Sequence, residues 1–143
     1  MFLGEFPYKV DEKGRVPLPP KFRNELQKGM VLTQGVDPCL CIYPLSEFEK
    51  VRAGISAQPG NAKGRRYKRF VFAKALEAKM DRMGRVPIPE WLRKYAGITD
   101  TAVIIGQDLY AEIWSPEKWQ AEGECFEEEA WQIAESVESQ KNG

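Results

Sequence analysis

The sequence predicts an α+β fold, mainly β with helices, in which one half-domain occurs twice within a single chain. Residues 11–19, DEKGRVPLP, return 70 positions later as residues 81–89, DRMGRVPIP, with six of nine positions identical. The similarity continues beyond this motif, because Ile42 and Tyr43 match Ile113 and Trp114 at an offset of 71. A chain of 143 residues favours one core shared by both halves, since two separate cores would each be near the lower size limit for stable folding.

Each half is expected to begin with a strand, a tight loop and a second short strand. Apolar residues alternate with others before each motif, which is typical of a half-buried strand: they are Phe6, Tyr8 and Val10 in the first half and Leu76, Ala78 and Met80 in the second. In the loops, Asp11 and Asp81 can accept backbone hydrogen bonds, while Gly14 and Gly84 can adopt backbone angles that other residues resist. These four residues are therefore predicted to shape the loops.

A short helix, a strand pair and a closing helix follow in each half. The prolines keep the chain extended until Pro19 and Pro89, so the short helices start after them. Their predicted apolar anchors are Phe22 and Leu26 in the first half and Trp91, Leu92 and Tyr95 in the second. The strand pairs are expected at 30–33 with 39–43 and at 102–105 with 109–114. Ser46 with Glu49 predicts a capping box for one closing helix, and Ser115-Pro116-Glu117 an equivalent start for the other.

These elements divide the chain into four segments. Residues 1–55 form the first repeat, 56–74 a connecting basic helix, 75–122 the second repeat and 123–143 an acidic C-terminal helix or tail. In the last segment Phe126, Ala130, Ile133, Ala134 and Val137 fall on one helical face. This stripe covers either its own core or a neighbouring subunit. Exposure of Trp114, Trp119 and Trp131 would favour the neighbour.

The net charge of zero conceals an asymmetry along the chain. Residues 1–94 hold 19 Lys and Arg against 10 Asp and Glu, whereas residues 95–143 hold 2 against 11. This distribution predicts a basic working surface and an acidic tail. No run of 18 apolar residues and no secretory signal occurs, so we expect a cytoplasmic protein without a membrane partner.

The residue inventory disfavours catalysis and metal binding. Without histidine, serine–histidine and cysteine–histidine nucleophilic chemistry is excluded. Cys39, Cys41 and Cys125 form an odd set without metal-ligand spacing, and are expected to be buried or half-buried free thiols. The sequence therefore predicts a protein that is not an enzyme and needs no metal or cofactor.

The loop residues offer three interpretations. Arginine beside a glycine turn can reach phosphates or base edges, which makes candidates for DNA contact of Lys13, Arg15, Arg82 and Arg85. Alternatively, Arg15 and Arg85 neutralise Asp11 and Asp81 within the turns, and both interpretations stay open. A shared-proton dyad of the two aspartates is disfavoured, because neither is followed by Thr-Gly or Ser-Gly.

Taken together, these motifs resemble the MraZ family of bacterial regulators, within the AbrB-like group of DNA-binding proteins. The resemblance covers nearly the whole chain and is carried by MF-x-GE at 1–5, both DxxGR loops, DPCLCIYP at 37–44, the arginines at 65–69 and EIW at 112–114. It implies an AbrB-like swapped-hairpin double-split β-barrel made of two fused half-domains. It also implies that the loop positions of Lys13, Arg15 and Arg85 contact DNA; Arg82 is added because Met83 replaces the second loop's lysine.

The family resemblance further implies a function. We expect a sequence-specific transcriptional regulator that binds double-stranded DNA repeats in the promoter of a cell-division and cell-wall gene cluster. It would act as a ring-shaped homo-oligomer at the nucleoid, without a cofactor. The alternative is an oligomeric assembly module whose loops contact other subunits instead of DNA. A steep loss of DNA binding with added salt would distinguish the regulator.

Overall fold

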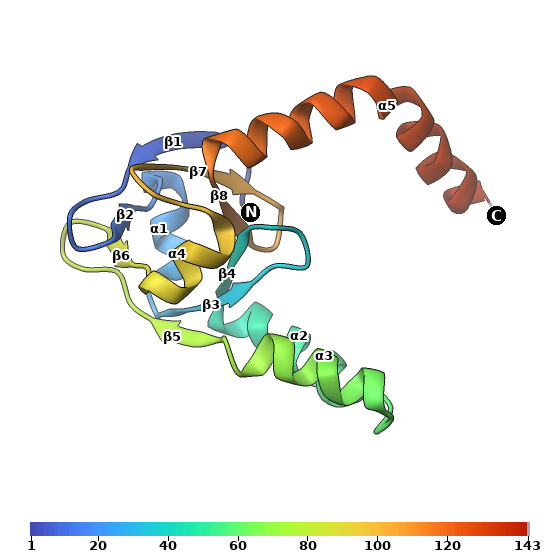
Figure 1. Ribbon diagram of the computed structural model, residues 1–143, viewed down its shortest axis with the longest axis horizontal. Coiled ribbons are helices and arrows are strands. Elements are labelled where there is room, and N and C mark those ends of the chain that lie inside the picture. Colours follow the sequence, from blue (N-terminus) through green and yellow to red (C-terminus); the bar gives the residue numbers. More distant parts are fainter. Residues whose placement is uncertain (143) are drawn as a thin grey trace.

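The computed structural model describes residues 1–142, in which eight strands and five helices are assigned (Figure 1). In chain order they are β1 (Glu5–Lys9), β2 (Arg15–Pro17), α1 (Pro20–Leu26), β3 (Met30–Gln34), β4 (Leu40–Pro44), α2 (Leu45–Ser56), α3 (Ala62–Phe72), β5 (Leu76–Ala78), β6 (Arg85–Pro87), α4 (Glu90–Ala96), β7 (Thr101–Gly106), β8 (Ala111–Trp114) and α5 (Pro116–Asn142). The predicted α+β class and the predicted order of elements in each half are confirmed.

Six strands form an antiparallel sheet in the order β1-β7-β8-β4-β3-β5. The order reads symmetrically from its centre, because β8 and β4 are equivalent strands of the two repeats, as are β7 and β3, and β1 and β5. Each repeat therefore gives its first strand to the other repeat's strand pair: β1 joins β7, and β5 joins β3. A separate two-stranded sheet pairs β2 with β6. Among the described residues the strand pairs do not close the larger sheet, whose edges are β1 and β5.

One core unites both repeats. Helices α1 and α4 bury Phe22, Leu26 and Leu92 against residues of the sheet. The predicted alternating residues, which lie in β1 and β5 or just after them, pack partly buried against the same cluster. Trp91 is a wrong prediction, because its side chain is 41% exposed and the Lys74 ammonium lies 5.4 Å from its ring centre. A shared main core follows from the strand exchange, since neither repeat completes its own sheet; a smaller cluster of Cys39, Val103, Ile105 and Trp114 lies apart from it.

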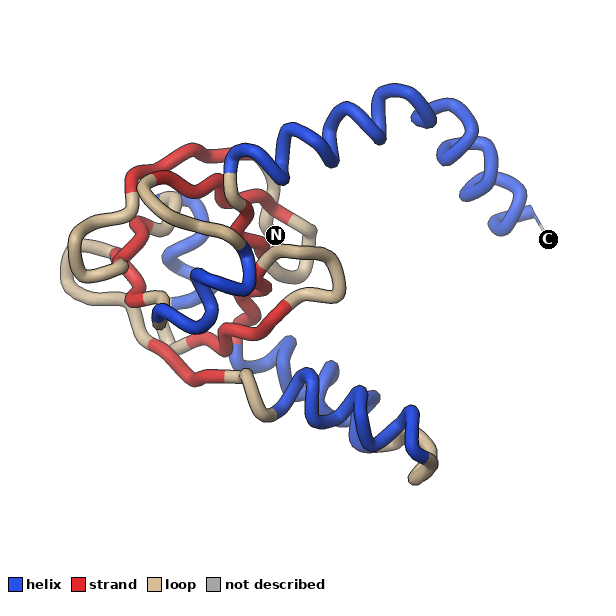
Figure 2. Tube along the Cα trace, in the orientation of Figure 1, coloured by secondary structure: helices blue, strands red, loops and turns tan. Residues whose placement is uncertain are grey.

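The remaining helices extend away from the sheet (Figures 1 and 2). Helices α2 and α3 form a hairpin on one side, and α5 projects on the other. The predicted capping box is wrong: α2 begins at Leu45, one residue before Ser46, after the extended Pro44, and no side chain caps it. The start of α5 is confirmed, with Pro116 first and the Ser115 hydroxyl accepting from the Lys118 amide at 3.2 Å.

Helix α5 continues without interruption past Gly123, where the sequence suggested the start of a separate segment. Its first turns cover the sheet through Trp119, which lies 5.5 Å from Trp114 between ring centres. Trp114 is only 3% exposed, so of the three tryptophans considered as interface anchors Trp131, at 65%, is the exposed one. Over residues 1–142 no helix combines the length and apolarity needed to cross a membrane.

Candidate nucleic-acid interface

The two motif loops lie side by side at the end of the molecule opposite the projecting helices (Figure 1). They meet because β2 and β6 pair with Val16 opposite Val86, both fully buried. Each loop also bonds to the other repeat: the Leu18 amide donates to the Gly84 carbonyl at 2.8 Å, and the Ile88 amide to the Gly14 carbonyl at 2.9 Å. The loops are thus fixed relative to each other by backbone bonds.

Each loop is folded around its aspartate. Oδ1 of Asp11 accepts from the amides of Lys13 and Arg15, both at 2.9 Å, and Oδ1 of Asp81 accepts from the amides of Met83 and Arg85 at the same distance. The backbone amide of the motif arginine is the main reason that the pKa of each aspartate is lowered, with the arginine side chain adding to it. Both aspartates are held ionised, the opposite of what a shared-proton dyad requires.

The two aspartates and the two arginines form one crossed cluster. Nε of Arg15 donates to Asp11 at 2.7 Å, and Nε of Arg85 to Asp81 at 2.9 Å. The Nη1 atoms reach across the axis between the loops, from Arg15 to Asp81 at 3.9 Å and from Arg85 to Asp11 at 3.7 Å. Charge neutralisation within the turns is therefore part of what the arginines do. Their side chains still keep 29% and 26% of their surface exposed.

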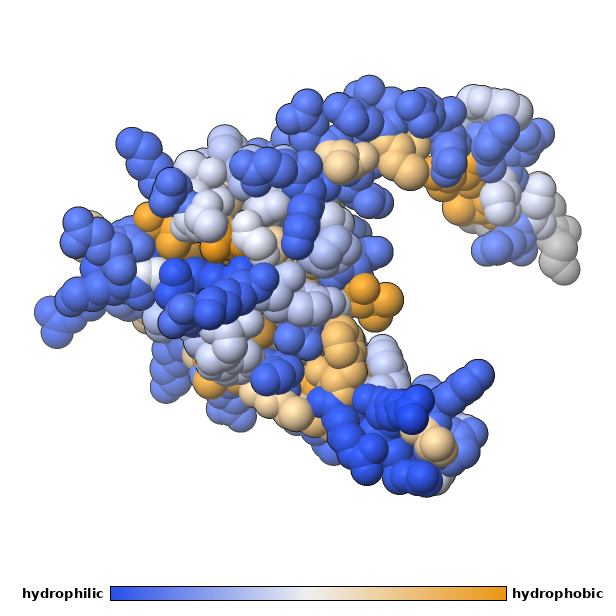
Figure 3. Space-filling view, viewed as in Figure 1, coloured by the Kyte–Doolittle hydropathy of each residue, from blue (hydrophilic) through white to orange (hydrophobic). Residues whose placement is uncertain are grey.

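The loop tips carry the exposed charges of the site. Glu12, Lys13, Arg82 and Met83 are all exposed, and among the described residues neither Lys13 nor Arg82 forms an ion pair. Figure 3 shows hydrophilic side chains over this end of the molecule. The structure thus brings the four predicted cations to one surface, two at the tips and two in the crossed cluster beneath.

Two further arginines brace the loops from the helices. Arg23 of α1 donates to the Leu18 carbonyl at 3.0 Å and lies against Gly84, and Arg93 of α4 donates to the Ile88 carbonyl at 2.9 Å and lies against Gly14. Sequence reasoning did not assign these arginines to the site. Their signal was their equivalent position in the repeat, four residues after the end of each motif.

A second cluster that sequence reasoning missed lies in the larger sheet. The ligand atoms of Cys39, Cys41 and Glu112 lie within 4.8 Å of one another, and all three side chains are buried. Cys41 stands directly opposite Glu112 in the β4–β8 pair. The signal available in the sequence was the repeat offset of 71, which makes Cys41 and Glu112 equivalent residues.

Gly54 in α2 provides a matched control for replacing a loop glycine with alanine. Gly84 has φ +77°, and a Cβ there would come within 2.4 Å of Arg23, whereas Gly54 in α2 has nothing within 4 Å. We expect Gly84→Ala to lower the free energy of unfolding by more than about 1 kcal/mol, because alanine resists positive φ. Gly54→Ala should instead raise it by roughly 0.5–1 kcal/mol. Urea unfolding followed by circular dichroism measures both, and a neutral or stabilising Gly84→Ala would contradict the loop geometry.

The crossed cluster predicts an acid-side loss of stability. Because the folded pKa values of Asp11 and Asp81 are lowered from 3.8, their contribution is fully present above about pH 4 and is lost as pH falls through the lowered values. Urea unfolding between pH 2 and 6 should show a smaller acid dependence for Asp11→Asn with Asp81→Asn than for the unaltered chain. Identical acid dependence would mean that these carboxylates are not shifted by folding.

Comparison with known proteins agrees with this arrangement. The family model described as "MraZ protein, putative antitoxin-like" matches residues 1–70 and again 71–138. A protein of Dehalococcoides mccartyi named "Transcriptional regulator MraZ" is 41% identical over 140 residues, covering 96% of this chain and 99% of its own. Proteins of the same name from Herpetosiphon aurantiacus and Frankia alni are 44% and 41% identical over 138 residues, covering 96% of both chains in each comparison. With a family match in each repeat and relatives alike over nearly their full length, this chain belongs to the MraZ family.

Proposed function

We propose that the chain is a DNA-binding transcriptional regulator whose paired loops contact double-stranded DNA. The observation that carries this proposal is the clamping of the two loops at one end of the molecule, with Lys13, Arg15, Arg82 and Arg85 on one surface. The names of the relatives, which are transcriptional regulators, support it. The loops themselves hold no group suited to bond-making chemistry, because both aspartates are neutralised by arginine. The loops are therefore proposed to bind DNA without catalysis and without a cofactor.

The two layers of cations suit different DNA contacts. We propose that Lys13 and Arg82 at the exposed tips neutralise phosphates, whereas Arg15 and Arg85, oriented by their aspartates, present a fixed guanidinium edge. Fixed arginines lose little freedom on binding, which favours base recognition by bidentate hydrogen bonds. The two loops would make different contacts with DNA, since Met83 stands where the first loop has Lys13.

The modest charge of one loop pair calls for several pairs acting together. We propose a ring-shaped homo-oligomer that engages repeats in the promoter of a cell-division and cell-wall gene cluster, at the nucleoid in the cytoplasm. Linked weak contacts combine through effective concentration. The exchange of β1 and β5 between repeats supports the related proposal of a swapped-hairpin barrel.

Helix α5 is the proposed contact between subunits. Beyond its first turns it carries exposed apolar residues on an acidic helix: Phe126, Trp131, Ile133 and Val137. Figure 3 shows apolar side chains along α5 on the side of the opening between α5 and the α2–α3 hairpin. Helix α3 is basic and largely exposed, so α5 of one copy is complementary to α3 of the next. Such head-to-tail contacts generate rings when they close.

The DNA assignment is tested by loop variants in a gel-shift assay with the upstream region of the protein's own gene. Replacing both Arg15 and Arg85 with alanine should abolish binding, because the variant lacks the oriented guanidinium groups. Lys13→Ala and Arg82→Ala should each weaken binding and lower the slope of log affinity against log salt by about 1, because each removes one cation that neutralises a phosphate.

Lys28→Ala is the matched control, since Lys28 is exposed but lies between α1 and β3, outside the loops. It should change neither affinity nor slope. Wild-type affinity in the Arg15 and Arg85 double variant, with fold and mass intact, would rule out the loop surface. A flat salt response of the unaltered protein would favour the alternative, an assembly module whose loops contact other subunits.

The subunit contact predicts a change in mass. Trp131→Ser combined with Val137→Ser should lower the molar mass measured by light scattering, because it removes exposed apolar surface from α5. Leu109→Ser is the control, since Leu109 is 56% exposed but lies in the β7–β8 turn. A mass unaffected by the α5 variant would refute this interface while leaving the DNA proposal standing.

A further inference from the structure

We propose that Cys39, Cys41 and Glu112 form a binding site for one thiophilic divalent cation, with Zn²⁺ as the expected ion. The three side chains come from β4, from the turn before it and from β8, and their ligand atoms lie within 4.8 Å of one another. Thiolate and carboxylate donors are among the common zinc ligands. This inference is independent of the DNA proposal, because the cluster is in the larger sheet and not in the loops.

Register brings the donors together. Cys41 is opposite Glu112 in the β4–β8 pair, so both side chains leave the same face of the sheet. Cys39, two residues before Cys41, points to that face as well. The turn from Gly35 admits its sulfur, because a Cβ on Gly35 would lie only 2.8 Å from Sγ of Cys39. Glycine at position 35 thus leaves room for the sulfur of Cys39.

The buried carboxylate of Glu112 is the second observation. Its residue is 6% exposed, yet among the described residues no cation pairs with it. Two neutral groups, Nε2 of Gln107 at 3.2 Å and Nε1 of Trp114 at 3.1 Å, both donate to Oε1. A buried carboxylate is costly without a positive partner, and a metal ion bound through Oε2 would supply one. The donors to Oε1 would then orient the ligand.

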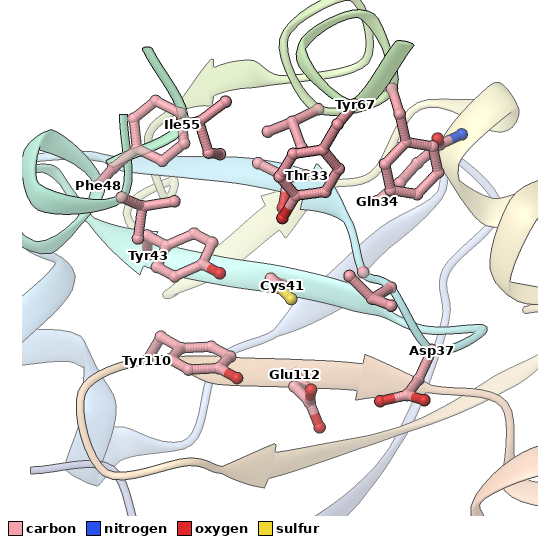
Figure 4. Close-up of a pocket in the computed structure, with 15 residues that line it drawn as sticks. Thr33, Gln34, Asp37, Cys41, Tyr43, Phe48, Ile55, Tyr67, Tyr110 and Glu112 are labelled. Atoms are coloured by element: carbon pink, nitrogen blue, oxygen red, sulfur yellow. The ribbon is translucent and has the colours of Figure 1, made fainter. Parts of the chain in front are cut away.

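The site opens to a cavity of about 130 Å³ between the sheet and the α2–α3 hairpin (Figure 4). Cys41, Glu112 and Asp37 face this cavity together with Tyr43 and Tyr110. A water in the cavity can occupy the fourth position of a tetrahedral ion. Because sulfur ligands favour zinc over magnesium or calcium, the donor set selects a thiophilic ion.

Distances allow this coordination after a small adjustment. Tetrahedral zinc with Zn–S bonds of about 2.3 Å holds its sulfur atoms roughly 3.7 Å apart. Donor atoms within 4.8 Å of one another would have to approach by at most about 1 Å, which rotation of the side chains would have to supply within the present strand register. Both cysteines would bind as thiolates and release their protons to solvent. The ion would connect β4 of the first repeat with β8 of the second.

The test uses the full-length, reduced protein after removal of metal with a chelator. Cobalt(II) added in steps should produce thiolate-to-cobalt charge-transfer absorption that saturates at one ion per chain, and zinc should displace it. Competition with a chromophoric chelator then gives the zinc affinity. Cys41→Ser should weaken this affinity by at least about 100-fold, since even loss of an outer-shell partner costs 10- to 100-fold.

Glu112→Gln keeps an acceptor for Trp114 but removes the charge, and should weaken zinc binding while retaining the thiolate absorption. Cys125→Ser is the control, because Cys125 is an exposed thiol on α5, and it should leave affinity and spectrum unchanged. Absence of thiolate–cobalt absorption in the unaltered protein overturns the proposal without reference to any variant. Absorption that disappears in Cys125→Ser but persists in Cys41→Ser overturns it as well.

Discussion

The pairing of β2 with β6, with Val16 opposite Val86, is the constraint on which the rest of the structure depends. In each repeat, the strand before this pair joins the other repeat's strands in the larger sheet, and the chain after this pair continues into the short helix of its own repeat. Both valines are fully buried and each loop carbonyl accepts a bond from the opposite repeat, so the two loops are held together in one arrangement. The relative position of the loops is thus a property of the core and not of flexible segments.

The same pairing of β2 with β6 determines the electrostatics of the proposed DNA surface. Each of Arg15 and Arg85 lies between two carboxylates, so the four charges of the crossed cluster cancel. What remains at the tips is Lys13 and Arg82 against Glu12. A surface with so small an excess of charge gives little electrostatic attraction by itself, so the oriented guanidinium groups are proposed to contribute to binding as well. This is why several loop pairs, rather than a stronger patch, are proposed to supply the affinity.

Local patterns predicted the strands, the short helices and the loop turns, because the same order of apolar and turn-forming residues occurs in both repeats. The predictions failed for two reasons: the exact start of a helix depends on the neighbouring backbone, and some side chains are placed by contacts distant in the sequence. Ser46 satisfies the capping pattern, but extended Pro44 lets the helix begin one residue before it. Trp91 is a large aromatic residue of the kind that anchors a helix to a core, but its ring faces Lys74. The role of Arg23 and Arg93 depends on the other repeat's glycine, and the cysteine cluster depends on the β4–β8 register, neither of which a local pattern contains.

Fusion of two repeats permits chemistry on the axis that two identical subunits could not have. Residues at the axis face their own equivalents, so in a symmetric dimer Val16 would face valine and Cys41 would face cysteine. In one chain the two copies can differ, and here Cys41 faces Glu112, while the loops present Lys13 on one side and Met83 on the other. A mixed thiolate and carboxylate donor set, and a pair of loops with unequal charge, both follow from this freedom. The pairing of Val16 with Val86 remains symmetric, and both side chains are buried in the shared core.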